Sequence, residues 1–166
     1  VQHTSDIGVR AMINFNTMAE LIRMAEEKSL PVHDIVLARE MHTSQRSRDV
    51  LWQEMQRNWQ VMQESVQRGI ANEEHSVSGL TGGDAKRLYA AREQSYTGTA
   101  VMAAAAYAVG IAEVNAVMGR IVACPTAGSC GIVPAALFAA AQHNGNTEDE
   151  IVGALFTAAG IGMVIE

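Results

Sequence analysis

The segment LWQEMQRNWQVMQESVQRG, residues Leu51 to Gly69, decides the fold class of this chain. Its large apolar side chains recur at intervals of three and four along an otherwise polar segment, as in a helix that buries a single stripe. These residues are Trp52, Met55, Trp59, Met62 and Val66. We expect both tryptophans to anchor helix packing rather than to contact a ligand. We also expect Thr43 or Ser44 to open this helix and Gly69 to close it as a C-terminal cap.

Helical patterns also cover the sequence on both sides of this segment. They predict a helix capped by Asn16 or Thr17 that runs to about residue 28, helices over residues 32–41, 84–93, 97–120 and 132–142, and a last helix after a capping box formed by Thr147 and Glu150. No strand-like alternation of useful length interrupts them. The sequence therefore predicts an all-α, compact domain of about six to seven helices, with Gly/Ser/Thr loops at helix N-termini.

The two ends of the chain differ from this helical part. Residues 1–15 lack periodicity, so we expect a leader or linker there and the helical domain over residues 16–166. The chain starts with Val1 instead of Met, and residues 158–165 form an apolar segment without a polar tail. Natural termini are usually polar. We therefore expect a fragment, truncated at its C-terminal side, whose last helix packs against something else.

Composition and charge exclude several classes of function. The net charge of −6, with Lys28 and Lys86 as the only lysines, argues against nucleic acid as a partner. Charged residues make up 18% of the chain, below the usual share of about a quarter, which indicates a buried or partner-covered surface. The most apolar run, residues 100–112, is too short to span a bilayer, and no secretory signal is visible. We therefore expect a soluble, cytoplasmic protein with free thiols and no membrane partner.

The segment VACPTAGSCGIVP, residues Val122 to Pro134, is the clearest candidate for function. It brings glycines, hydroxyls, thiols and prolines together directly before a predicted helix. Small residues let the backbone approach a ligand, and a helix start offers unpaired N–H groups, so the segment suits a small anion such as a carboxylate or phosphate. A tight turn between two helices, with a proline near the start of the second, explains the same residues without a ligand.

A second loop, SGLTGGD at residues 78–84, also precedes a predicted helix, and by itself it is a linker with an Asp cap. It has no P-loop ending and no strand before it, so neither a P-loop nor a dinucleotide fold is expected. Cys124 and Cys130 are too few ligands for a zinc or iron–sulfur site, and no histidine lies near them. Neither a catalytic triad nor a Schiff-base lysine is indicated. Polar residues interrupt the apolar helix before residue 120 and need partners if buried, namely Glu113, Asn115 and Arg120.

The segment NAVMGRIVACPTAGSCGIVPA, residues 115–135, resembles the signature of the iron–sulfur-dependent L-serine dehydratases, in the α chain or α domain. The loop at residues 78–84 and the run from Met18 to Arg68 are similar to the α-subunit branch, so the resemblance covers roughly residues 15–166. It implies an L-serine ammonia-lyase of serine catabolism that forms pyruvate and ammonia. It also implies a 4Fe–4S cluster in the complete enzyme, L-serine as substrate, a β chain or β domain as partner, and a homo- or hetero-oligomer.

The same resemblance implies a substrate site made of both loops. Thr126 to Ser129 would offer donors to the serine carboxylate, residues 78–84 would form the neighbouring wall, and Asn115 would orient the signature segment. The implied substrate-binding residues are Thr126, Ala127, Gly128, Ser129, Ser78, Thr81, Gly82, Gly83, Asp84 and Asn115. No catalytic residue is assigned to this chain.

The resemblance also places the cluster cysteines of the family beyond residue 166. Cys124 and Cys130 lie where family members also carry alanine or threonine, so we assign no metal ligand to this chain. The resemblance thus implies an N-terminal portion without a cluster, inactive by itself. The alternative is a non-catalytic helical scaffold or subunit-interaction module that keeps the loops only as turns. Coding sequence beyond residue 166 with further cysteines would favour the enzyme.

Overall fold

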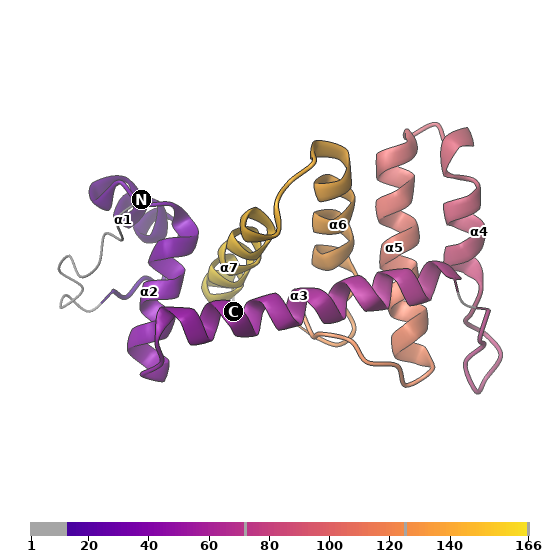
Figure 1. Ribbon diagram of the computed structural model, residues 1–166, viewed down its shortest axis with the longest axis horizontal. Helices are drawn as coiled ribbons and strands as arrows, with labels where there is room; N and C mark the ends of the chain where they lie inside the picture. The colour runs from indigo at the N-terminus through magenta and orange to yellow at the C-terminus, as the bar shows by residue number, and fades with distance from the viewer. Residues whose placement is uncertain (1–12, 72, 125, 166) are drawn as a thin grey trace. The chain divides into compact units, whose positions relative to one another are not determined.

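The computed structural model describes residues 13–71, 73–124 and 126–165, and over these residues the chain forms helices and no strand (Figure 1). The elements are α1 (Met18–Lys28), α2 (Val32–Ser44), α3 (Arg48–Ala71), α4 (Asp84–Ala90), the 3-10 helix η1 (Arg92–Gln94), α5 (Thr99–Ala116), α6 (Ile132–Asn144) and α7 (Glu148–Ile165). The predicted all-α fold is confirmed.

Local capping chemistry defines two of the helix starts. The Thr17 hydroxyl accepts the N–H of Glu20 at 3.2 Å before α1. Before α7, Glu150 accepts the N–H of Thr147 at 2.7 Å, and the Thr147 hydroxyl accepts the N–H of Glu150 at 3.4 Å. Both caps were predicted, because each depends only on residues three apart in the sequence.

The boundaries predicted for α3 were wrong at both ends. Of its predicted apolar stripe, Trp59, Met62 and Val66 are buried, and Trp52 and Met55 are half-buried. Ser44 belongs to α2, and Gln45 follows with a left-handed φ of 57°. The chain then starts α3 at Arg48, where the Ser47 hydroxyl accepts the N–H of Val50 at 3.4 Å. Gly69 does not close α3, because the helix continues to Ala71.

The chain divides into two compact units, and the boundaries between the units fall within α3 and within α7. The described part of unit 1 comprises residues 13–55 and 152–165, and that of unit 2 comprises residues 56–71, 73–124 and 126–151.

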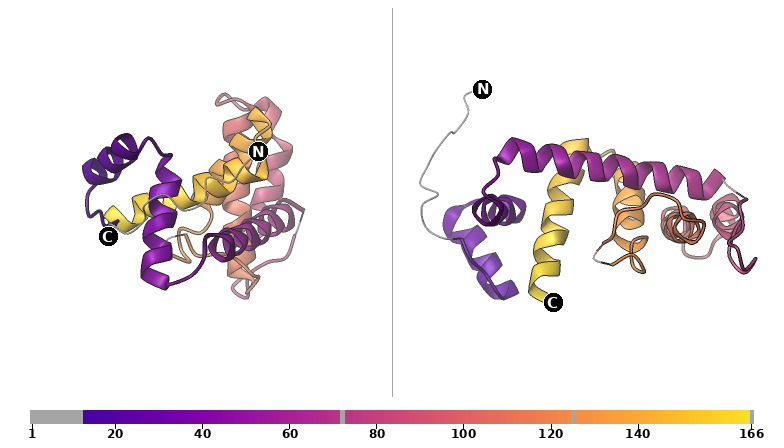
Figure 2. Two further views of the ribbon diagram at one scale, coloured as in Figure 1. Left: turned by 60° about the vertical axis from the view of Figure 1, so that its left-hand side comes forward. Right: turned by 90° about the horizontal axis from the view of Figure 1, so that it is seen from below.

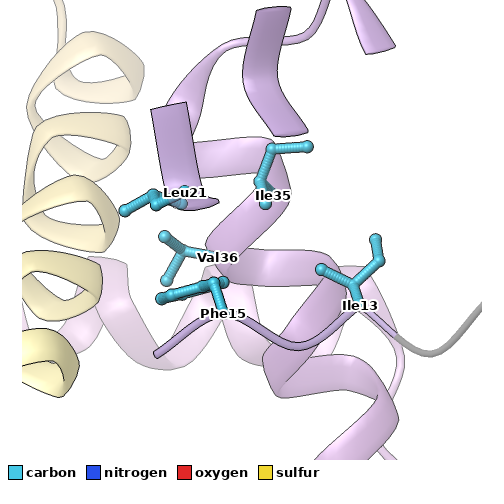
Figure 3. Packing of buried hydrophobic residues seen from close by; sticks show 5 residues of the cluster. All are labelled: Ile13, Phe15, Leu21, Ile35 and Val36. Carbon is cyan, nitrogen blue, oxygen red and sulfur yellow. The ribbon is translucent and has the colours of Figure 1, made fainter. Parts of the chain in front are cut away.

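A hydrophobic cluster in unit 1 joins α1, α2 and the segment before α1 (Figure 3). It consists of Ile13, Phe15, Leu21, Ile35 and Val36. Phe15 is fully buried, and Arg39 donates to its carbonyl oxygen at 2.7 Å. The predicted leader therefore overlaps the core at Ile13 and Phe15, where burial is set by partners distant in the sequence. Residues 1–12 of the predicted leader lie outside the described residues.

In unit 2, α5 lies between α4 and α6 (Figure 1), and Figure 2 shows the same order from a second direction. The ring of Phe138 on α6 lies 5.9 Å from that of Trp59 and meets that of Tyr107 edge-on at 5.1 Å. In unit 1, Trp52 stacks on Phe156 at 5.7 Å. Both tryptophans therefore pack against aromatic neighbours, as their helical spacing predicted.

Helix α5 is longer than the apolar run that the sequence analysis judged too short for a bilayer. It has 18 residues and is long and apolar enough to cross a membrane by length and composition alone. The core helix of a soluble protein meets the same criterion, so this is weak evidence for a membrane span. Within unit 2, α5 buries Ala106, Tyr107 and Ile111 to 1% exposure or less.

Gly69 has a packing role instead of the predicted capping role. A Cβ atom at Gly69 would lie 2.4 Å from the Cα of Gly110 on α5, and one at Gly110 would lie 3.1 Å from the Cα of Gly69. The backbones of α3 and α5 therefore approach each other at two residues without side chains.

We predict that Gly69→Ala lowers the free energy of unfolding by about 1–3 kcal/mol, because the methyl group forces the two helices apart. Gly162→Ala is the matched control, since a Cβ there meets nothing within 4 Å. It should raise the stability by about 0.5–1 kcal/mol, as alanine does in a helix interior. Urea unfolding measures both values, and equal effects of the two variants would contradict the close approach.

Candidate functional site

Two loops rich in glycine, serine and threonine lie at the same end of unit 2, the lower edge of Figure 1. We call residues 76–84, which precede α4, the glycine loop. We call residues 119–131, which lead from α5 into α6, the signature loop; its Pro125 lies outside the described residues. Side chains from the C-terminal part of α5 contact both loops.

A closed hydrogen-bonded turn shapes the signature loop before α6. The Thr126 hydroxyl accepts the N–H of Ser129 at 3.2 Å, and the Ser129 hydroxyl accepts the N–H of Thr126 at 3.3 Å. The two hydroxyl oxygens are 2.9 Å apart. This reciprocal pattern is that of a capping box, and it gives both side chains a defined orientation. Ala127 and Gly128, between them, are exposed to solvent.

Two side chains hold the signature loop on the neighbouring helices. Asn115 on α5 donates from Nδ2 to the carbonyl oxygen of Ala127 at 3.4 Å. The Ser65 hydroxyl on α3 lies 2.9 Å from the carbonyl oxygen of Arg120 and 2.8 Å from that of Val61, so one proton serves both acceptors. The sequence analysis had singled out Asn115 and had missed Ser65, which shows no pattern of its own.

Short-range hydrogen bonds fold the first part of the glycine loop into a compact turn. Ser76 donates its N–H to the carbonyl oxygen of Thr81 at 2.8 Å, and its hydroxyl accepts the N–H of Thr81 at 3.3 Å. The hydroxyls of Ser76 and Ser78 are 3.1 Å apart. Ser78 is exposed and Thr81 is half-buried.

Gly82 and Gly83, near the end of the glycine loop, disfavour side chains for different reasons. Gly82 is buried with φ of 144°, and a Cβ there would lie 2.3 Å from the carbonyl oxygen of Glu74. Gly83 has φ of 78° and is the N-terminal neighbour of α4, so no side chain caps this helix locally. Asp84 is the first helical residue and pairs with Arg87. The cap expected from Asp84 is therefore absent.

The N-terminus of α4 is capped by a residue of α5. Glu113 Oε1 accepts the N–H of Asp84 at 2.7 Å and that of Ala85 at 3.4 Å. Glu113 is only 6% exposed, and the two amides supply the hydrogen bonds that a buried carboxylate requires. The sequence showed Glu113 as a polar interruption of an apolar helix but not which residues it would contact.

The structure brings the predicted site residues together in two groups. Asn115 contacts the signature loop, and Glu113, two residues earlier on the same helix, contacts the end of the glycine loop. Among the described residues, no hydrogen bond or ion pair joins residues 76–84 directly to residues 119–131. Ser78 in particular bonds only within its own loop. The role of these residues in substrate binding stays a prediction.

The two cysteines have few potential metal ligands around them in the part of the chain that the structure describes. No group of three or more potential metal ligands exists among the described residues. Cys130 is buried, and burial raises the pKa of both thiols; the nearby Cys130 raises that of Cys124 further. A 4Fe–4S cluster uses deprotonated cysteines, usually four, so it does not fit this donor set.

We predict that native Cys124 reacts more slowly with iodoacetamide at pH 8 than it does in the unfolded chain. Burial raises its pKa, so less of the reactive thiolate is present, and the difference should narrow as the pH rises through the folded pKa. Mass spectrometry of the Cys130→Ala variant isolates the Cys124 signal. Equal rates in the folded and unfolded chains at pH 8 would contradict the raised pKa.

The comparison with known proteins agrees with the sequence resemblance. The family model described as "Serine dehydratase alpha chain" matches residues 27–166, which include both loops. The "Probable L-serine dehydratase, alpha chain" of Bacillus subtilis is 39% identical over 91% of this chain and 51% of its own length. The "L-serine dehydratase, alpha chain" of Peptoniphilus asaccharolyticus is 34% identical over 90% of this chain and 52% of its own length.

A third relative, the "L-serine dehydratase" of Streptomyces coelicolor, is 32% identical over 92% of this chain and 34% of its own length. The chain thus spans about half the length of the two α-chain relatives and about a third of this longer one. The match includes α2 to α7 and the hydrogen-bonded loops on α5. The chain belongs to the serine dehydratase alpha chain family.

Proposed function

We propose that this chain is the part of an L-serine dehydratase α chain that binds the substrate, with the signature loop holding the carboxylate of L-serine. The complete enzyme would convert L-serine to pyruvate and ammonia together with a β chain or β domain. The names of the relatives and the match over residues 27–166 support the family role. The shape of residues 126–129 supports the position of the carboxylate.

The observation that carries the proposal is an exposed turn with fixed donors. Thr126 and Ser129 fix each other through reciprocal hydrogen bonds. Between them, the amides of Ala127 and Gly128 donate to none of the described residues. Successive backbone N–H groups in a turn before a helix form a common anion-binding arrangement. A carboxylate is the anion that an L-serine dehydratase must bind.

The described residues supply binding and orientation but not the whole chemistry. They form no metal site, and none of their thiols has a lowered pKa. The 4Fe–4S cluster implied by the resemblance therefore needs ligands from another part of the longer protein. The base that removes the α-proton of serine is likewise unassigned among the described residues.

A scaffold or subunit-interaction role is the second candidate, and one observation favours it. The Thr126 and Ser129 hydroxyls already bond to each other and to the backbone, which explains their presence as a cap for the turn before α6. In that case the loop needs no ligand. The two candidates differ in whether the exposed backbone at Gly128 contacts a substrate.

We predict that Gly128→Ala in the complete enzyme raises the KM for L-serine about tenfold, which corresponds to about 1.4 kcal/mol of lost binding. A Cβ at Gly128 meets only the Thr126 hydroxyl, at 3.8 Å, so the fold accommodates it. The added methyl group stands beside the amides proposed to hold the carboxylate. Steady-state kinetics and thermal unfolding of the same preparations separate the two effects.

Gly162→Ala is again the control, because it adds the same methyl group in unit 1, where nothing lies within 4 Å. It should leave the KM unchanged. An unchanged KM for Gly128→Ala, at unchanged melting temperature, would reject the carboxylate position and favour the scaffold role.

A further inference from the structure

We propose that Glu113 is a positioning residue of the candidate site, which holds the end of the glycine loop on α5, the helix that also contacts the signature loop. Through this contact it places the wall formed by residues 78–84. The inference rests on the proposed function, because it gives this wall a part in binding L-serine. Glu113 itself acts through the backbone of Asp84 and Ala85, not by touching the substrate.

The cap on α4 differs in origin from the caps on α1 and α7. Before α1 and α7, the capping side chains lie within three residues of the amides that they bind. The cap of α4 comes instead from a residue 28 and 29 positions away in the chain. A local cap stabilises a helix wherever that helix lies, whereas a cap from α5 exists only when α4 is seated on α5.

The two glycines before α4 disfavour a local side-chain cap. Gly82 cannot carry a side chain, since its Cβ would meet the Glu74 carbonyl oxygen at 2.3 Å. Gly83 has the left-handed φ of 78°, which disfavours Ser and Thr, two of the best capping residues. The end of the glycine loop therefore depends on an acceptor from outside, and Glu113 is the side chain that supplies it.

Glu113 and Asn115 are two positions apart on α5, and each contacts one of the two loops. Glu113 accepts the N–H of Asp84, the last residue of the glycine loop, and that of Ala85, whereas Asn115 donates to the Ala127 carbonyl oxygen within the signature loop. Both contacts therefore start from the same turn of a rigid helix. Moving the N-terminus of α4 away from α5 requires breaking the Glu113 contact.

A buried carboxylate is a costly way to stabilise a helix of seven residues. Glu113 is 6% exposed, and every buried side-chain nitrogen or oxygen in the described residues has a hydrogen-bond partner. The charge-assisted bond to Asp84 N–H, at 2.7 Å, offsets that cost only while the loop stays in place. The contact therefore favours one position of the loop over alternatives.

The first test is amide hydrogen exchange of the complete enzyme, followed by mass spectrometry of peptides that cover residues 82–90. Glu113→Ala should increase exchange in these peptides, because the amides of Asp84 and Ala85 lose their acceptor. Glu113→Gln should largely retain protection, because the amide oxygen of glutamine accepts the same N–H groups. Ile111→Val is the matched control, since it changes a buried side chain of the same helix without touching these hydrogen bonds.

The second test is steady-state kinetics of the same variants with L-serine. Glu113→Ala should raise the KM about tenfold while kcat changes by less than about threefold, as expected for loss of a binding wall. Glu113→Gln should restore the KM to within about threefold of the wild type. If Glu113→Ala does not fold, Glu113→Asp replaces it, since its shorter side chain withdraws the acceptor while keeping the charge.

The outcomes separate this inference from the proposed function. If Glu113→Ala shows faster exchange at residues 82–90 but an unchanged KM, the positioning role is overturned. This conclusion does not depend on the KM of Gly128→Ala. Unchanged exchange would overturn the contact itself. A raised KM for Glu113→Ala with no effect of Gly128→Ala would support the role of Glu113 but reject the signature loop as the carboxylate site.

Discussion

The backbone contact between Gly69 of α3 and Gly110 of α5 is the constraint on which unit 2 depends. A Cβ atom on either glycine would meet the other helix at 2.4 Å or 3.1 Å, so the absence of side chains at both positions lets the helices approach this closely. A Cβ at Gly110 would also lie 3.3 Å from that of Ala85, so α4 packs at the same position. Both α3 and α4 thus pack against α5 at Gly110. Glu113 and Asn115, further along the same helix, contact the two loops.

The polar residues near the end of α5 and on α3 bind backbone rather than solvent. Glu113 accepts the first amides of α4, Asn115 donates to the signature loop, and Ser65 contacts the carbonyl oxygen of Arg120. Each contact joins a helix to the backbone of one of the two loops. Apolar packing, as between Trp59 and Phe138, holds the helices together, and these few polar contacts place the loops.

Different contacts fix the two loops: bonds within the loop fix the signature loop, and a bond from α5 fixes the glycine loop. The signature loop is closed by its own Thr126 and Ser129, so its shape is local. The glycine loop has two glycines before its last residue, Asp84, and relies on Glu113. A substrate that touches both loops would therefore meet one rigid turn and one wall whose position depends on α5. The chain spans about half the length of its α-chain relatives.

The sequence by itself determined the helical class, the apolar stripe through Trp59, and the caps at Thr17 and Thr147, because these depend on residues within a few positions of each other. Its signature segment also indicated the family that the comparisons show. Only the tertiary structure decided that Gly69 is a packing contact and that Glu113 caps α4. Those roles depend on residues about 30 to 40 positions apart meeting across helices, and the periodicity of a single segment carries no information about such contacts.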